Sequence, residues 1–228
     1  MSKGIFITAT GTDVGKTYIT GLITKKLREN GINAGYYKAA LSGSEIINGK
    51  QTAGDARFVC EISGIQEKPE DLISYIYKTS VSPHLAAQIE NKPVETDLIV
   101  SDFNKMKKKF DFITAEGSGG IICPLRMDDK VIMLTDVINL LKLDVIIVAQ
   151  AALGTINSTV LTVKYAQSSG ICVKGIILNH YDNKSFLHSD NKKTIEKLSN
   201  IPVIACVSEN SRELNIDIDK LIELYEEI

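Results

Sequence analysis

The stretch GIFITATGTDVGKT, residues 4–17, decides the fold class of this 228-residue chain. Gly4–Thr10 is a short apolar, β-branched run that predicts a strand, and a turn containing Gly11 and Gly15 follows it. From Lys16 to Asn30, apolar residues recur at helical spacing. A glycine-bearing turn between a strand and a helix directs backbone N–H groups toward phosphates. The stretch therefore predicts a phosphate-binding loop for a nucleoside triphosphate.

Strands and helices alternate along the rest of the chain. The predicted strands are Asn33–Lys38, Asp111–Ala115, Asp144–Ala149, Val173–Leu178 and Val203–Val207, and the predicted helices are Ala53–Ser63, Pro83–Asn91, Asp97–Lys109, Thr135–Leu141, Thr155–Ser169, Asn191–Ser199 and Asp217–Glu227. The polar stretch Leu41–Gln51 predicts a surface loop. This alternation predicts an α/β fold, in a single domain over residues 1–228, with a doubly wound and mostly parallel sheet. Such sheets bind their ligands outside the carboxyl ends of the strands.

The composition argues against several classes of partner. The formal net charge of −2 provides no basic field for nucleic acid or an anionic membrane surface. The four cysteines are widely separated and form no metal-type or redox-type pair. The most apolar region, Val131–Leu153, is interrupted by Asp136, Lys142 and Asp144, which argues against a membrane span. Since the N-terminus carries no signal-peptide pattern, we expect a soluble, cytoplasmic protein.

The predicted phosphate loop supplies the first candidate site residues. The Lys16 ammonium would neutralise the β- and γ-phosphate oxygens, and the Thr17 hydroxyl would ligate Mg²⁺. The loop departs from the usual G-x-x-x-x-G-K spacing, because Thr10 occupies the position of the first glycine. The alternative is an ordinary glycine-bearing turn before a helix, and the strand–loop–helix context argues against it.

Two acidic residues are candidates to complete a metal site. Glu116 follows a predicted strand, where its carboxylate could reach Mg²⁺ from the neighbouring strand end. The next residues are Gly117, Ser118 and Gly119, and the glycines would let the backbone approach the nucleotide closely. Asp55, at a predicted helix start, is a second candidate ligand. A solvated strand-end glutamate and an ordinary helix N-terminal acid remain the alternatives.

Further polar residues lie at the same predicted edge of the sheet. Lys38 ends the second strand, where it could bridge the γ-phosphate and an anionic co-substrate, and Ser42 beyond it is a candidate substrate contact. Asn179 ends another strand, where its amide could read a nucleobase edge. A solubilising lysine and a turn-forming asparagine are the alternatives. A helix start with free N–H groups for a carboxylate is formed by Leu153, Gly154, Thr155, Ile156 and Asn157.

The chain resembles the dethiobiotin synthetase family in a series of motifs that follow the family's order. These are FITATGTDVGKT (Phe6–Thr17), YKAALSGS (Tyr37–Ser44), GDA (Gly54–Ala56), SPHLAA (Ser82–Ala87), EGSGG (Glu116–Gly120), LGTINSTVLT (Leu153–Thr162) and LNH (Leu178–His180). The irregular phosphate-loop spacing is itself typical of this family. Ala9 and Ala39 replace a glycine and a proline of the family pattern. Residues 205–210 differ from the family's purine-framing segment, so the resemblance assigns no nucleobase contact there.

The resemblance implies a nucleotide and metal site. Mg²⁺ would lie among Thr17, Asp55 and Glu116, and Asn179 would hold the adenine of ATP. Contacts to the ATP phosphates would come from Thr12, Asp13, Val14, Gly15, Lys16 and Thr17. The family acts as a homodimer, in which the helix start at 153–157 of one subunit receives the carboxylate of a substrate bound mainly to the other.

The implied reaction joins 7,8-diaminononanoate to CO₂ (or bicarbonate) with ATP. A carbamate on one amine attacks the γ-phosphate, and the second amine then closes a ureido ring with loss of phosphate. Lys38 would be the catalytic lysine and Ser42 would contact the substrate. Since the carbamate is already an anionic nucleophile, the step needs cationic stabilisation, which Lys16, Lys38 and Mg²⁺ can supply.

Three other functions compete with this one. A deviant-loop switch ATPase of the partitioning or targeting class would carry a signature lysine at the position of Gly11. An amidating synthetase of cobalamin synthesis would need a glutaminase domain with a nucleophilic cysteine, for which this chain has no room. A pure nucleotide-binding module would leave Lys38 and Ser42 without a role.

Overall fold

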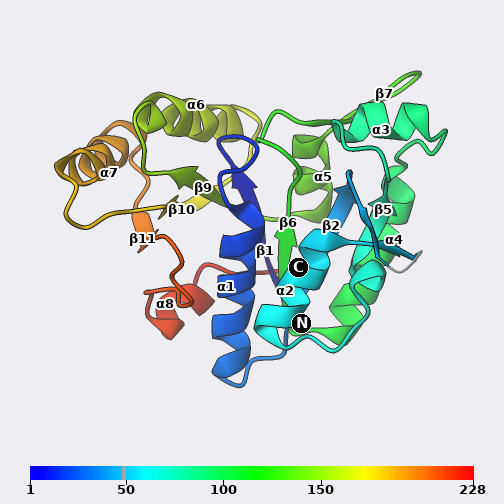
Figure 1. The fold of residues 1–228 in the computed structure, drawn as a ribbon, viewed down its shortest axis with the longest axis horizontal. Helices are drawn as coiled ribbons and strands as arrows, with labels where there is room; N and C mark the ends of the chain where they lie inside the picture. The colour runs from blue at the N-terminus through cyan, green and yellow to red at the C-terminus, as the bar shows by residue number, and fades with distance from the viewer. Residues whose placement is uncertain (48–49) are drawn as a thin grey trace.

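The computed structural model describes residues 1–47 and 50–228, and a central sheet organises them (Figure 1). Within these residues the sheet has eight strands, seven of them in the spatial order β11-β10-β9-β1-β6-β2-β5. Those seven are β1 (Lys3–Ala9), β2 (Ala34–Leu41), β5 (Ile73–Ile76), β6 (Phe112–Glu116), β9 (Val145–Gln150), β10 (Val173–Asn179) and β11 (Val203–Val207). Neighbours in this order all pair in parallel, so the predicted α/β fold with a mostly parallel sheet is confirmed.

The order of the strands reverses direction at β1, which lies between β6 and β9. The chain leaves β1 through α1 (Lys16–Glu29) and enters β2, one strand beyond β6. It later returns to β6 and then crosses to β9 on the opposite side of β1. In doubly wound sheets such a switch point, outside the carboxyl ends of the strands, is where ligands bind. The predicted phosphate loop begins there, directly after Ala9.

Helices cover both faces of the sheet. Alternate residues of each strand point to opposite faces, so both faces present apolar side chains that the helices bury. The helices are α1, α2 (Gly54–Ser63), α3 (Pro83–Ile89), α4 (Thr96–Lys109), α5 (Leu134–Leu141), α6 (Thr155–Ser168), α7 (Phe186–Ser199) and α8 (Ile218–Ile222), with a 3₁₀ turn at Pro69–Leu72. Ile5 and Ile7 belong to a core that includes α1 and α8. Phe6 and Ile147 belong to a second core that includes α4, α5 and α6.

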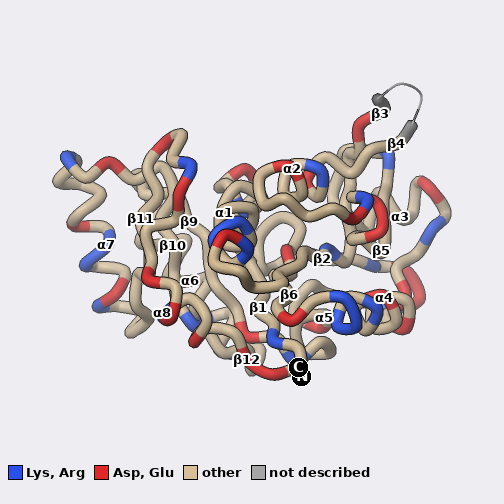
Figure 2. Tube along the Cα trace, turned by 90° about the horizontal axis from the view of Figure 1, so that it is seen from below, with Lys and Arg blue, Asp and Glu red and all other residues tan. Residues whose placement is uncertain are grey.

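The prediction of one closing helix over Asp217–Glu227 is wrong. Only Ile218–Ile222 is helical, and the chain then forms β12 (Glu226–Glu227), which pairs antiparallel with the start of β1. The Tyr225 hydroxyl lies 2.7 Å from the buried hydroxyl of Thr114. This tertiary contact turns the chain end toward the sheet, and helical periodicity does not encode it. Both termini consequently lie together in Figure 2.

Several short elements were not predicted from the sequence. The predicted loop Leu41–Gln51 contains β3 (Glu45–Ile47) and the start of β4 (Lys50–Thr52), which pair antiparallel, while Asn48 and Gly49 lie outside the described residues. The other elements that were not predicted are β5 and the hairpin of β7 (Pro124–Met127) and β8 (Val131–Met133). Strands of three or four residues are too short for a periodic signal. Helix α7 begins five residues before the predicted start at Asn191, at Phe186.

Charged residues of both signs are interspersed along the chain trace (Figure 2). The last turn of α4 is basic and contains Lys107, Lys108 and Lys109. Among residues 1–47 and 50–228, no helix has the length and apolar character that a membrane span requires.

The central strand β9 should contribute strongly to stability. We expect Ile147→Ala to lower the free energy of unfolding by about 2–5 kcal/mol, because Ile147 is fully buried and truncation leaves a cavity. Denaturant unfolding measures this value. Leu198→Ala on the exposed side of α7 is the control, with an expected change within about 0.5 kcal/mol. Equal losses in the two variants would contradict the burial assigned to β9.

Candidate functional site

The turn between β1 and α1 forms a phosphate-type loop shaped by two residues at positive φ. Asp13 has φ 57° and Gly15, the N-cap of α1, has φ 93°. Side chains from neighbouring strands hold the loop. The Asn179 amide donates to the Val14 carbonyl at 3.1 Å, and the Gln150 amide donates to the Asp13 carbonyl at 3.2 Å. The first N–H groups of α1 have no intrahelical partner and remain available to an anion.

Lys16, the first residue of α1, lies against this loop. Its side chain is buried, and its ammonium donates to the Gly11 carbonyl at 3.1 Å. Burial lowers the pKa of Lys16, with the nearby Lys38 charge acting in the same direction and Glu116 opposing both. A phosphate-loop lysine needs this position beside the loop to reach the β- and γ-phosphates.

A cluster of polar side chains surrounds the Glu116 carboxylate at the end of β6. Lys38 of β2 pairs with Glu116 in the strand register, and Lys38 Nζ lies 2.8 Å from Glu116 Oε1. The Thr17 hydroxyl donates to the same oxygen at 2.7 Å, and the Tyr36 hydroxyl donates to Oε2 at 2.9 Å. Asp55, in the first turn of α2, forms a salt bridge with Lys38. Four elements therefore converge on one hydrogen-bonded network.

Burial and charge decide the ionisation of this cluster. Lys38 is 4% exposed and Glu116 is 1% exposed. Burial disfavours the charged form of Lys38, but the Glu116 and Asp55 carboxylates outweigh burial and hold the pKa of Lys38 above its ordinary value. Burial raises the pKa of Tyr36, and the Glu116 charge raises it further. The network thus holds a charged lysine between two carboxylates, with a protonated tyrosine beside them.

A cavity of about 900 Å³ opens over the loop and the cluster. The predicted site residues that line it are Thr12, Asp13, Gly15, Lys16, Thr17, Lys38, Ser42, Asp55, Glu116, Ser118 and Gly119. Sequence reasoning gave no site role to Cys123, nor to Ser82 and Pro83 at the start of α3, although the latter two lie in a family motif. Burial raises the pKa of the Cys123 thiol to about 11, so the thiol is protonated at neutral pH.

The remaining predicted residues do not line this cavity. Val14 and Asn179 are buried beneath the loop, and the Gly117 N–H donates to the Ile7 carbonyl at 2.9 Å inside the sheet. A separate position, at the turn into α6, is occupied by Leu153, Gly154, Thr155, Ile156 and Asn157. Leu153 is 86% exposed there. The helix start at 153–157 thus lies outside the cavity that the phosphate loop and the Glu116 cluster line.

The oxygen donors of the cluster fit Mg²⁺. The Thr17 hydroxyl and the Glu116 and Asp55 carboxylates are linked in one network, and hard oxygen ligands are those that Mg²⁺ prefers. In the described part of the chain, no three His, Cys, Asp or Glu residues gather into a group that could hold a metal ion. A phosphate-loop site does not need such a group, since its Mg²⁺ takes one or two carboxylates together with a hydroxyl and substrate phosphates.

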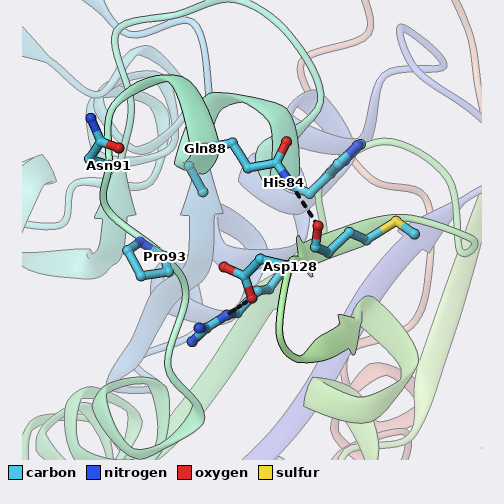
Figure 3. A pocket seen from close by; sticks show the side chains of 8 residues that line it. His84, Gln88, Asn91, Pro93 and Asp128 are labelled. Atoms are coloured by element: carbon cyan, nitrogen blue, oxygen red, sulfur yellow. Dashed lines mark hydrogen bonds and ion pairs between the residues drawn. The ribbon is translucent and has the colours of Figure 1, made fainter.

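A second cavity, of about 320 Å³, lies between α3 and β7 and shares no lining residue with the first (Figure 3). His84 and Gln88 line one side, and the Gln88 amide donates to the Met127 carbonyl at 2.7 Å. On the other side, Arg126 Nε donates to Asp128 Oδ1 at 2.6 Å. The guanidinium of Arg126 is already engaged by acidic side chains, so this cavity offers no free cation to an anionic ligand.

The parallel sheet and the loop at its switch point define a P-loop NTPase fold. The chain is similar to the MinC:MinD cell division protein complex of Aquifex aeolicus, with a TM-score of 0.58 and 13% identity over 97% of this chain and 86% of that one. It is also similar to a ParA family ATPase from Chlorobium tepidum TLS, with a TM-score of 0.55 and 16% identity over 97% and 88% of the two chains. At these identities the likeness concerns the fold alone.

More similar relatives define the family within this class. A family model described as "AAA domain" matches residues 3–214. The chain is 54% identical over 228 residues to the ATP-dependent dethiobiotin synthetase BioD of Clostridium botulinum (strain 657 / Type Ba4), covering 100% of both chains. It is 50% identical to the BioD of strain Eklund 17B / Type B, covering 99% of both. The chain belongs to the dethiobiotin synthetase family, as its motifs predict.

The close packing of the loop makes Gly15 a sensitive position. A Cβ on Gly15 would lie 2.1 Å from the Asn179 amide nitrogen, and its φ of +93° already disfavours other residues. We expect Gly15→Ala to displace the loop and to weaken ATP binding by about tenfold or more, or at least about 1.4 kcal/mol. Fluorescent ATP-analogue binding measures the change.

Gly31→Ala is the matched control for this substitution. Gly31 also has positive φ, at +79°, but a Cβ there meets nothing within 4 Å, and Gly31 does not line the phosphate-loop cavity. We expect it to lower stability through backbone strain and to leave ATP affinity unchanged. A similar loss of ATP affinity in both variants would refute the role given to the Gly15–Asn179 contact.

Proposed function

We propose that this protein is an ATP-dependent dethiobiotin synthetase, which converts 7,8-diaminononanoate and CO₂ (or bicarbonate) to dethiobiotin with release of ADP and phosphate. The observation that carries the proposal is the buried Lys38, which lies within β2, three residues before the end of the strand at Leu41. It is held by Glu116 and Asp55 and lines the same cavity as the phosphate loop. The names of relatives that match this chain from end to end support it.

The proposed reaction has three steps, which are formation of a carbamate, transfer of the γ-phosphate and closure of a ring. One amine of the diamine adds to the carbon of CO₂ and loses a proton, which gives a carbamate. A carbamate oxygen attacks the γ-phosphorus, and the bond to ADP breaks with its electrons on the leaving ADP. The second amine then attacks the carbamate carbon and closes a ureido ring, the bond from that carbon to the phosphate oxygen breaks, and the amine's proton is lost as phosphate leaves. No step requires an activated serine, cysteine or histidine.

The residues of this chain would supply binding and charge. The start of α1 and Lys16 bind the phosphates. Lys38 stabilises the negative charge that gathers where an anionic carbamate meets an anionic phosphate. Ser42, in the cavity wall beyond Lys38, would contact the substrate. When bound to Thr17, Glu116 and Asp55, Mg²⁺ would neutralise phosphate charge during transfer.

We further propose that the active form is a homodimer in the cytoplasm and that residues 1–228 act as one domain. The dimer is supported by the placement of residues 153–157, which do not line the cavity of their own chain and could meet a substrate bound to a partner subunit. Asn179 would hydrogen-bond the adenine through the amide atoms that are not already bonded to the Val14 carbonyl.

A switch ATPase is the second candidate, since its class shares the fold. Its signature lysine is absent, because that position is Gly11 here. The two functions differ in what stimulates ATP turnover. We expect phosphate release from ATP only when both 7,8-diaminononanoate and bicarbonate are present. A coupled phosphate assay measures this, and equal turnover without the diamine would exclude the synthetase function and favour the switch ATPase.

Lys38 should be needed for turnover and not for nucleotide binding. We expect Lys38→Ala to reduce diamine-dependent turnover by about 100- to 1000-fold, because one preorganised group that stabilises transition-state charge is lost. ATP binding should persist, since the phosphate loop is intact. Lys25→Ala is the control and should retain full turnover, because this partly exposed lysine of α1 does not line the cavity. Unchanged turnover in Lys38→Ala would remove Lys38 from the mechanism.

A further inference from the structure

Tyr36 is a buried residue whose only polar atom on the side chain is committed to the Glu116 carboxylate. Its side chain is 0% exposed and lies in the middle of β2. The hydroxyl donates to Glu116 Oε2 at 2.9 Å. None of the sequence motifs predicts this contact, because a tyrosine in a buried strand is ordinarily a core residue.

The two oxygens of Glu116 have separate partners. Oε1 accepts from Thr17 at 2.7 Å and from Lys38 at 2.8 Å, so it faces the loop and the cavity. Oε2 accepts from Tyr36, whose side chain is fully buried. A carboxylate fixed at one oxygen by a buried donor cannot rotate freely about its last torsion angle. The Tyr36 hydroxyl therefore determines which oxygen Glu116 presents to Thr17.

Strand geometry explains why Tyr36 can do this and its neighbour cannot. Residues two apart in a strand share a face, so Tyr36 lies on the same face as Lys38. Tyr37 lies on the opposite face, where its hydroxyl is 2.8 Å from the Ser74 hydroxyl and its ring packs against Phe103 of α4. The two tyrosines are equally buried and adjacent, and only one of them contacts the cluster.

We infer that Tyr36 is a positioning residue that orients Glu116 as a ligand for the divalent cation of the nucleotide site. The inference rests on the proposed function only in its assignment of Thr17, Asp55 and Glu116 as the metal site. Outer donors of this kind fix the orientation of metal ligands, and their loss typically weakens metal affinity by about 10- to 100-fold. Tyr36 touches neither the phosphates nor the substrate in this role.

The test compares metal binding with nucleotide binding in Tyr36→Phe. The probe is Mn²⁺, followed by electron paramagnetic resonance, in the presence of a non-hydrolysable ATP analogue. We expect the apparent Kd of Mn²⁺ to rise by about 10- to 100-fold. The affinity for the same analogue in EDTA should not change, since the loop and Lys16 are untouched. In a Glu116→Ala background, Tyr36→Phe should have no further effect on Mn²⁺ affinity.

Tyr37→Phe is the matched control, because it also removes a buried hydroxyl from β2 but leaves Glu116 alone. We expect its Mn²⁺ affinity to equal that of the unmodified protein. Unchanged Mn²⁺ affinity in Tyr36→Phe, or equal weakening in both variants, would overturn the inference. If Tyr36→Phe does not melt cooperatively, Tyr36→Met takes its place, since a flexible methionine fills the space without a hydroxyl.

These binding measurements need neither the diamine nor turnover. Failure of diamine-dependent phosphate release would therefore refute the proposed synthetase activity and leave the Tyr36 result standing. Conversely, full synthetase turnover with unchanged Mn²⁺ affinity in Tyr36→Phe would refute only the role of Tyr36.

Discussion

The buried carboxylate of Glu116 is the constraint on which the rest of the site depends. An ionised carboxylate taken out of water costs several kcal/mol unless donors compensate it, and Glu116 is 1% exposed. Its donors come from two elements, since Thr17 lies in the first turn of α1, and Tyr36 and Lys38 belong to β2. These elements reach it because β6 lies between β1 and β2. The strand order thus creates the cluster, and the cluster in turn fixes the side chains that face the cavity.

Charge balance in the cluster supports the proposed divalent cation beside the nucleotide. Two lysines, Lys16 and Lys38, interact electrostatically with two carboxylates, Glu116 and Asp55, so the group carries no net charge. A triphosphate adds negative charge that Lys38 cannot neutralise while it is paired with the two carboxylates. A cation bound by the carboxylates would release lysine charge toward the phosphates. The Thr17 hydroxyl, which donates to Glu116 in this structure, would turn its oxygen toward such a cation.

The sequence predicted this architecture well where the chain is strongly periodic or continuously apolar. β9 and α1 are long enough for their patterns to decide their type, and the residues at the strand ends followed from the parallel order. The prediction failed where tertiary contacts override the local pattern. An example is β12, which pairs with β1 next to the buried Tyr225. Tyr36 was missed for a related reason. Spacing shows that a tyrosine is buried in a strand, but not which side chain on the adjacent strand its hydroxyl meets.

The sheet does not by itself select the reaction, because proteins of different kinds share it. The structural neighbours are 13% and 16% identical to this chain, whereas a Clostridium botulinum synthetase is 54% identical. The proposed synthetase differs from a switch ATPase in the expected position of a second cation. A lysine at the position of Gly11 would act within the phosphate loop. Lys38 instead lies on β2, two strands from β1, in a cavity whose wall continues to Ser42 and Ser82. That position suits a second anionic reactant beside the γ-phosphate, which is the arrangement that phosphoryl transfer to a carbamate requires.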